Sequence, residues 1–269
     1  MSPGMTEILF SIGAGDRVVG VTDFCDYPAE ATKLPSVGGM LNPSFETIIT
    51  LQPDLIIHQK GSHEVSKFAQ RLGIKTLEVP MLSLEDIFTG IIKVGQEIDS
   101  NEGAENLVRE LRAEINRHQK RLANVKRKSV LLLLGVSNDV SRDMYAVGRK
   151  TFIGELLSLA GGENILPESQ PLYPKISKEY VIRKSPEIII EVGPTGILSD
   201  EEIAKRKNNW KKFPTLRAVQ NDAVHIISAN YLLKPGPRLI KIISHFVDAI
   251  HPKLAENPMS SAAALEAMP

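Results

Sequence analysis

Residues 46–57 read ETIITLQPDLII, and residues 179–190 read EYVIRKSPEIII. Each segment begins with a glutamate, has a proline seven positions later, and continues with an acidic residue and three aliphatic residues. Ser44 and Ser177 stand two positions before the two glutamates. Because serine caps helices and proline is excluded from their interiors, each segment predicts a short helix followed by a buried strand. The repetition indicates that the chain has two related halves.

A second pair of matching segments supports a duplication. Residues 7–15 read EILFSIGAG, and residues 155–162 read ELLSLAGG. Each is typical of an apolar helix that ends at glycines suited to a C-cap. The two matches follow the same order in both halves, which favours duplication over chance.

One long helix is predicted between the halves. Residues 101–125 contain no proline and a single glycine, and four apolar residues fall near one helical face: Leu107, Leu111, Ile115 and Leu122. We expect a helix from Glu102 to Asn124, about 35 Å long. The predicted domains are an N-terminal α/β lobe at 1–100, a connecting helix at 101–126, a C-terminal α/β lobe at 127–257 and a disordered tail at 258–269.

Short aliphatic segments alternate with helical ones along both halves. Such alternation is typical of parallel sheets that helices cover on both faces. The sequence therefore predicts an α/β fold with two Rossmann-like lobes, parallel sheets, one long α-helix joining the lobes and a ligand cleft between them. The predicted strands are residues 18–21, 55–58, 76–79, 130–134, 188–191 and 224–227.

The composition excludes several classes of protein. The formal net charge is +0, which argues against a nucleic-acid partner. The longest apolar run, residues 130–136, is too short to cross a bilayer. A single cysteine, Cys25, excludes an intramolecular disulfide. The chain leads from Met1 directly into a helical segment, so we expect either that an export signal and a first strand have been removed from this sequence or that its start codon is misplaced.

Motifs of catalysis are not found. The sequence lacks Gly-x-Ser-x-Gly, a P-loop, His-Glu-x-x-His and a Gly-x-Gly-x-x-Gly after a strand. The neighbouring acids Asp23 and Asp26 make Cys25 a poor nucleophile. We therefore expect that the protein is not an enzyme. The enzyme alternative is a sugar-nucleotide enzyme with two Rossmann-like lobes, against which the missing nucleotide-binding loop counts.

Aromatic residues in loops are the first candidates for ligand contact. Phe24, Tyr173 and Tyr231 either stack on a flat ligand or pack their own loops. Arg238 opens the final helix, where a cation opposes the helix dipole. Its guanidinium either binds a carboxylate or phosphate of a ligand or is solvated.

Two pairs of charged or titratable residues leave alternatives open. His58 ends a strand and His63 lies in the next loop, so with a carboxylate they would form a metal-ion receptor, although their spacing matches no standard ligand set.

Glu46 and Glu179 occupy equivalent places in the two halves. They are either ordinary first-turn glutamates or carboxylates that dock onto a symmetric partner with two basic sockets.

Four segments of the first half form a recognisable set: residues 2–10 (SPGMTEILF), 13–21 (GAGDRVVGV), 25–28 (CDYP) and 51–55 (LQPDL). Residues 161–165 (GGENI) and 235–238 (PGPR) look like the matching signatures of the second half. Together these segments resemble the vitamin B12-binding protein family of ABC importers. The resemblance covers residues 2–254. The family belongs to the helical-backbone solute-binding proteins, which also include siderophore and haem binders.

The resemblance implies an extracytoplasmic solute-binding protein that delivers a corrinoid to a membrane permease. A ferric siderophore or haem is the alternative ligand. The ligand is therefore expected to be a cobalt corrinoid or an iron chelate, and we expect no separate cofactor. The implied partner is an ABC permease dimer with its ATPase, whose arginines pair with Glu46 and Glu179. The implied protein is a monomer at the periplasmic or extracellular face of the cell membrane, associated with the membrane through the permease.

The expected cleft departs from the family pattern. The B12 binders carry tryptophans where this chain has Gln59, Tyr173 and Tyr231, and a tyrosine where it has Phe24. Residues 37–42 also lack an expected tryptophan, and the single Trp210 is expected outside the cleft. The predicted ligand contacts are Phe24, Gln59, Tyr173, Tyr231 and Arg238. The resemblance therefore predicts a cleft that is less aromatic and more polar than in those relatives.

Overall fold

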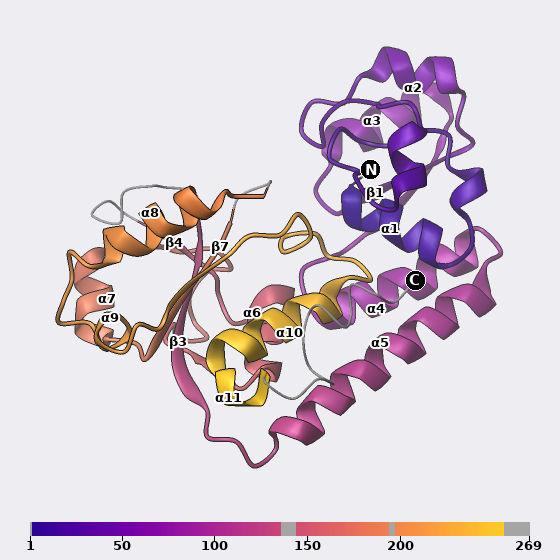
Figure 1. Ribbon diagram of the computed structural model, residues 1–269. Coiled ribbons are helices and arrows are strands. Elements are labelled where there is room, and N and C mark those ends of the chain that lie inside the picture. The colour runs from indigo at the N-terminus through magenta and orange to yellow at the C-terminus, as the bar shows by residue number, and fades with distance from the viewer. Residues whose placement is uncertain (1, 136–143, 194–196, 256–269) are drawn as a thin grey trace. The chain divides into compact units, whose positions relative to one another are not determined.

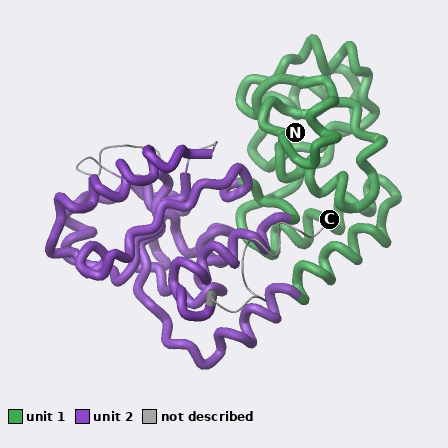
Figure 2. Tube along the Cα trace, viewed as in Figure 1, with its two compact units in different colours: residues 1–113, 234–237 green, residues 114–233, 238–269 purple. Residues whose placement is uncertain are grey.

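The computed structural model describes residues 2–135, 144–193 and 197–255 (Figure 1). The chain forms two compact units, which are coloured separately in Figure 2. Unit 1 consists of residues 1–113 and 234–237, and unit 2 consists of residues 114–233 and 238–269. The division falls within helix α5 (Asn101–Leu122), so a single continuous helix supplies residues to both units. This helix agrees closely with the predicted span.

Unit 1 surrounds a small parallel sheet. Strands β1 and β2 pair in register from Leu55 opposite Lys75 to Gln59 opposite Val79. Between and around them lie four α-helices. The elements of this unit before α5 are α1 (Pro3–Ser11), η1 (Gly15–Arg17), η2 (Ala29–Lys33), α2 (Phe45–Leu51), β1 (Leu55–Gln59), α3 (His63–Leu72), β2 (Lys75–Val79) and α4 (Leu84–Glu97).

Local signals in the sequence set the ends of these helices. Ser83 and Asp86 form a reciprocal capping box at the start of α4. Helix α3 ends at Gly73, which has a φ of 69° and therefore adopts the left-handed conformation that favours glycine. Gly13 and Gly161, in the two matching apolar segments, also have positive φ just after α1 and after α6 (Phe152–Leu159). The predicted glycine C-caps are thus confirmed in both halves.

Unit 2 is built on a six-stranded sheet with the order β6-β4-β3-β7-β8, and β5 pairs with β3. Strands β5, β7 and β8 are each parallel to their neighbour, whereas β4 and β6 are antiparallel. The strands are β3 (Lys128–Leu134), β4 (Met144–Ala146), β5 (Gly162–Asn164), β6 (Lys175–Ile176), β7 (Ile188–Val192) and β8 (Val224–Ile227). The helices, besides α6, are α7 (Lys178–Lys184), α8 (Asp200–Trp210), α9 (Arg217–Gln220), α10 (Leu239–Ile250) and α11 (Pro252–Ala255).

The predicted α/β fold with parallel strands is confirmed, with one strand prediction wrong. Residues 18–21 do not form a strand: Val21 makes only an isolated parallel bridge to Ser36, with hydrogen bonds from Val21 to the Pro35 carbonyl and from Val37 to the Val21 carbonyl. A single bridge is too short to propagate a ladder. The predicted disordered tail at 258–269 lies outside the described residues.

A buried charged network lies in the core of unit 2. The indole of Trp210 donates to Glu191 over 2.6 Å, and Arg206 donates to the Gly135 carbonyl over 2.9 Å while its guanidinium lies 3.5 Å from Glu191. Burial raises the pKa of the Glu191 carboxyl above its usual range, although Trp210 and Arg206 oppose that shift. Trp210 is therefore a core residue of unit 2.

The segment Lys234–Pro237 belongs to unit 1, although unit 2 residues flank it in the sequence. The ammonium of Lys234 donates to the Phe24 carbonyl over 3.0 Å and lies 2.6 Å from the Asp26 carboxylate. At Gly4 in α1, a Cβ atom would lie 2.1 Å from the carbonyl oxygen of Pro235. Only glycine permits this approach of helix and segment.

Among the residues that the structure describes, no helix is long and apolar enough to span a membrane.

Candidate functional site

The two glutamates lie on helices built in the same way. Ser44 caps α2 by accepting a hydrogen bond from the Thr47 backbone N–H over 3.2 Å, and Ser177 caps α7 by accepting one from the Tyr180 N–H over 3.3 Å. Each helix has seven residues and one acid in its first turn, Glu46 or Glu179. The serine caps predicted from the sequence are thus present in both units, where they fix the turn that carries the glutamate.

The two helices also end in the same unusual way. Gln52 has φ 47° and Ser185 has φ 39°, so both are in the left-handed conformation that non-glycine residues rarely adopt. A proline follows each of them, and one face of each helix is buried through Ile48 or Val181. The left-handed residue and the proline end the helix and turn the chain into a buried strand.

Replacing Gln52 with glycine is expected to stabilise unit 1. Glycine adopts a positive φ without the steric cost that glutamine has there, so we expect the free energy of unfolding to rise by up to about 1 kcal/mol. Thermal denaturation followed by circular dichroism measures the effect. The control is Gln52→Ala, which keeps a Cβ and should bring no gain. Equal stability of the two variants would show that the left-handed conformation costs nothing.

Both glutamates are exposed at the start of their helices. This position is stabilising for a carboxylate because the helix N-terminus carries a partial positive charge. The structure thus places Glu46 and Glu179 on corresponding surfaces of the two units, as the repeated sequence predicts. Their use as docking residues stays a prediction.

An apolar surface lies on two loops of unit 1. The loop with the predicted contact Phe24 is tied to the loop at 36–43 by a hydrogen bond from Asp23 to the Gly38 carbonyl, 3.1 Å long. Four exposed hydrophobic side chains lie on these loops: Phe24, Tyr27, Met40 and Leu41. Leu41 is 98% exposed. Sequence reasoning considered residues 37–42 for a missing tryptophan, and it missed Met40 and Leu41 as candidate contacts.

The histidines do not form a metal centre in the described residues. The His58 ring is fully buried, with Nδ1 3.0 Å from the Gln59 carbonyl oxygen and Nε2 3.2 Å from the Ser66 hydroxyl. His63 is the first residue of α3. No group of three or more His, Cys, Asp or Glu suited to a metal ion occurs within the described ranges. Both ring nitrogens of His58 already have partners, so the structure does not favour the metal-ion receptor.

Tyr231 and Arg238 lie together in unit 2. The Arg238 guanidinium lies 4.9 Å from the centre of the Tyr231 ring and donates to the Asn230 side chain over 3.0 Å. The Tyr231 hydroxyl is 2.7 Å from Nε2 of His245, and the two rings stack. Both Tyr231 and Arg238 are buried. The Arg238 guanidinium, a cation at a helix start, thus has binding partners within the protein itself: the Tyr231 ring and the Asn230 side chain.

The remaining predicted contacts differ in exposure. Gln59 is the last residue of β1 and is half-buried. Tyr173 is exposed, and partial burial of its hydroxyl raises the pKa of Tyr173 above its usual range. Cys25 is buried, with its sulfur 3.2 Å from the hydroxyls of Thr6 and Thr22. That environment suits a packed thiol rather than a nucleophile.

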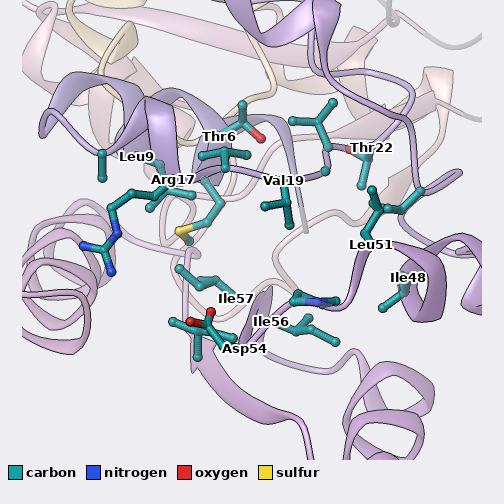
Figure 3. A pocket seen from close by; sticks show the side chains of 18 of the residues that line it. Thr6, Leu9, Arg17, Val19, Thr22, Ile48, Leu51, Asp54, Ile56 and Ile57 are labelled. Carbon is teal, nitrogen blue, oxygen red and sulfur yellow. The ribbon is translucent and has the colours of Figure 1, made fainter.

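A separate groove of about 370 Å³ lies within unit 1. Figure 3 shows side chains from α1, η1, the segment that follows η1 and β1 around it, including Leu9, Arg17, Val19, Ile56 and Ile57. None of the predicted ligand contacts lines it. Its volume is near the lower limit for small-molecule sites, which makes it too small for a ligand as large as a corrin macrocycle.

The chain thus forms two α/β units that share one long helix, and each unit has a capped helix that presents a glutamate. A family model described as periplasmic binding protein matches residues 1–231. The chain therefore belongs to the periplasmic binding protein family. As the sequence predicts, it is a substrate-binding protein of the ABC-importer type, and its family is extracytoplasmic.

Three similar proteins illustrate the relationship. The ABC transporter substrate-binding lipoprotein YvrC of Bacillus subtilis is 26% identical over 258 residues, which cover 94% of this chain and 79% of the relative. The crystal structure of the periplasmic vitamin B12 binding protein BtuF of Vibrio cholerae has a TM-score of 0.77 at 27% identity and covers 96% of each chain. A periplasmic heme binding protein from Pseudomonas aeruginosa has a TM-score of 0.78 at 23% identity, covering 93% of this chain and 90% of the other. At that identity the last likeness concerns the fold alone.

Proposed function

We propose that this chain binds a corrinoid outside the cytoplasm and delivers it, chemically unchanged, to an ABC permease. The observation that carries the proposal is the pair of equivalent capped helices that present Glu46 and Glu179. A likeness to a vitamin B12 binding protein over nearly the whole chain supports the ligand class.

The exposed apolar loops of unit 1 support a large ligand with an apolar face. Phe24, Met40 and Leu41 are solvated in the structure, which is unfavourable for side chains of this size. A flat macrocycle that covers them would remove that apolar area from water, while the aromatic ring of Phe24 stacks on it. Gln59, a half-buried polar residue of the same unit, would then hydrogen-bond to a polar substituent at the rim of the ligand.

Delivery requires a partner with two matching sites. In this proposal, Glu46 and Glu179 form charge-assisted hydrogen bonds to arginines, one on each subunit of a permease dimer that is coupled to its ATPase. The chain acts as a monomer and associates with the membrane only through that permease. Because one glutamate lies in each unit, the permease contacts both units at once.

A ligand titration tests the corrinoid assignment. We expect cyanocobalamin and cobinamide to bind with dissociation constants in the micromolar range or below, and haem and ferric siderophores to bind more weakly. Isothermal titration calorimetry and visible absorbance of the ligand are the measurements. Protein fluorescence is a poor readout, since the single Trp210 is buried in the core of unit 2. Tighter binding of haem than of either corrinoid would overturn the assignment.

Variants of the apolar loops locate the site in the same titration. We expect Phe24→Ala combined with Leu41→Ala to weaken corrinoid binding at least tenfold, because apolar area buried against the ligand is lost. The matched control is Leu72→Ala, which removes an exposed leucine at the end of α3 in the same unit. Equal affinities of all three proteins would place the ligand away from these loops.

A further inference from the structure

The two docking helices carry exposed isoleucines in addition to their glutamates. Among the described residues, three helical positions carry large hydrophobic side chains that are well exposed: Ile49 of α2 at 51%, Leu72 of α3 at 48% and Ile182 of α7 at 42%. Leu72 is the last residue of its helix, where the chain leaves for the next strand. Ile49 and Ile182 instead lie inside their helices, at corresponding positions of the repeated segment.

Each isoleucine lies on the same helical face as the glutamate of its helix. Ile49 follows Glu46 by three positions, and Ile182 follows Glu179 by three positions. Residues three apart are neighbours on a helix surface, about 5–6 Å between their Cβ atoms. The residue before each isoleucine, Ile48 or Val181, points into the core and is buried. Helix geometry therefore separates a buried aliphatic residue from an exposed one in both units.

Packing within each unit covers only part of each isoleucine. Ile182 lines a small pocket together with Trp210 and Phe213 in unit 2. Even so, 51% of Ile49 and 42% of Ile182 stay exposed, and the exposed part contributes no hydrophobic stabilisation. Isoleucine is also a weaker helix former than the charged residues usual on an exposed face. A lone exposed aliphatic residue would need no explanation. Two of them at equivalent positions, each beside an exposed carboxylate, point to a common role.

We propose that Ile49 and Ile182 form the apolar part of the surface that docks on the permease. This rests on the proposed function, in which Glu46 and Glu179 meet arginines. An arginine that pairs with a carboxylate lays its aliphatic stem along the adjacent surface. An isoleucine three positions from the glutamate covers that stem and excludes water from the ion pair. The partner proposed here is the permease dimer, in which each subunit has an equivalent socket with an arginine beside an apolar rim.

The charges around the two glutamates show why an apolar contact is useful. Helix α7 has Arg183 and Lys184 in its last turn, and both lie near the ring of Tyr180, at 5.7 and 5.9 Å. Helix α2 has no basic residue in its last turn. A basic socket thus meets fewer cations on the last turn of α2 than on the last turn of α7. The isoleucines give both units the same apolar contact, and apolar contacts are not screened by salt.

The test compares the binding of variants to the permease–ATPase complex of this importer, purified in lipid nanodiscs. The full chain with Ile49→Ala and Ile182→Ala is expected to bind about a hundredfold more weakly, about tenfold for each isoleucine. This loss is expected to be similar at low and high salt. The charge-reversed protein with Glu46→Arg and Glu179→Arg should lose binding altogether. Leu72→Ala serves as the control for removal of an exposed aliphatic residue and should bind like the unmodified chain.

Circular dichroism and the ligand titration are carried out on the same variants, so that a loss of permease binding is not mistaken for a loss of folding or of ligand binding. Ile49→Val with Ile182→Val keeps most of each apolar contact and should lose less than tenfold. Unchanged permease binding of the alanine pair, together with loss of binding on charge reversal, would overturn the role of the isoleucines alone. Unchanged binding of both pairs would overturn the docking surface as a whole. An equal loss with Leu72→Ala would overturn the assignment to the two equivalent positions.

Discussion

Reversing both docking charges, with Glu46→Arg and Glu179→Arg, is expected to abolish uptake and to leave ligand affinity unchanged. In the proposed complex, each substitution replaces an ion pair with two like charges at close range, which costs several kcal/mol at an interface. Two such sites together should weaken docking by at least about a thousandfold. The ligand contacts are on other loops, so the ligand titration should match that of the unmodified chain.

Measuring this effect requires both uptake of a labelled corrinoid by cells and the isolated titration. The matched control is Glu102→Arg with Glu201→Arg. These glutamates are also exposed acids in the first turns of helices, α5 in unit 1 and α8 in unit 2. Control and test proteins therefore change net charge equally and lose the same favourable interaction with a helix dipole, about 0.3–1 kcal/mol per helix.

A comparison of uptake between the test variant and the control variant distinguishes a role in docking from an effect on helix stability. If the control loses uptake as fully as the test protein, total charge or helix stability explains the effect, and docking through Glu46 and Glu179 is rejected. Retained uptake with both docking charges reversed would reject it directly. Each single reversal should weaken uptake less than the pair does, because one ion pair remains.

The repeated segment made much of this architecture predictable. Serine, the proline and the aliphatic triplet that follows it are local signals, and α2, β1, α7 and β7 appear where those signals lie. Helix α5 was predictable for the same reason, since its apolar stripe and lack of proline extend over its whole length. In both cases residues close in sequence determine the structure.

Features that depend on distant residues could not be predicted. Strands β4 and β6 are too short to show an apolar period, and they exist because they pair with each other and with β3. Residues 18–21 are aliphatic enough for a strand, yet only Val21 forms a bridge. Tyr231 contacts His245 of α10, and Arg238 lies over the Tyr231 ring, so the partners of both residues are distant or depend on a neighbour that is itself packed. Nothing in the sequence around Met40 or Leu41 reveals that Phe24 lies on the neighbouring loop.

Gly4→Ala is expected to destabilise unit 1, although alanine is the better helix former. In an isolated helix the substitution would stabilise by about 1 kcal/mol. Here the new Cβ atom would lie 2.1 Å from the Pro235 carbonyl oxygen, and a backbone atom at that distance must move. Overpacking of this kind costs about 1–3 kcal/mol. We therefore expect a lower melting temperature and faster chymotrypsin cleavage near Leu233, which precedes the displaced segment.

The matched control for this prediction is Ser11→Ala, at the exposed end of the same helix. It brings the helix-propensity gain without a clash, so its melting temperature should equal or exceed that of the unmodified chain. Equal melting temperatures of Gly4→Ala and Ser11→Ala would mean that α1 does not pack on the segment Lys234–Pro237. If the packing is as observed, Gly4→Ala also loosens the hold of Lys234 on the Phe24 carbonyl. Corrinoid affinity should then fall with stability, since the loop that presents Phe24 loses a support that lies far away in the sequence.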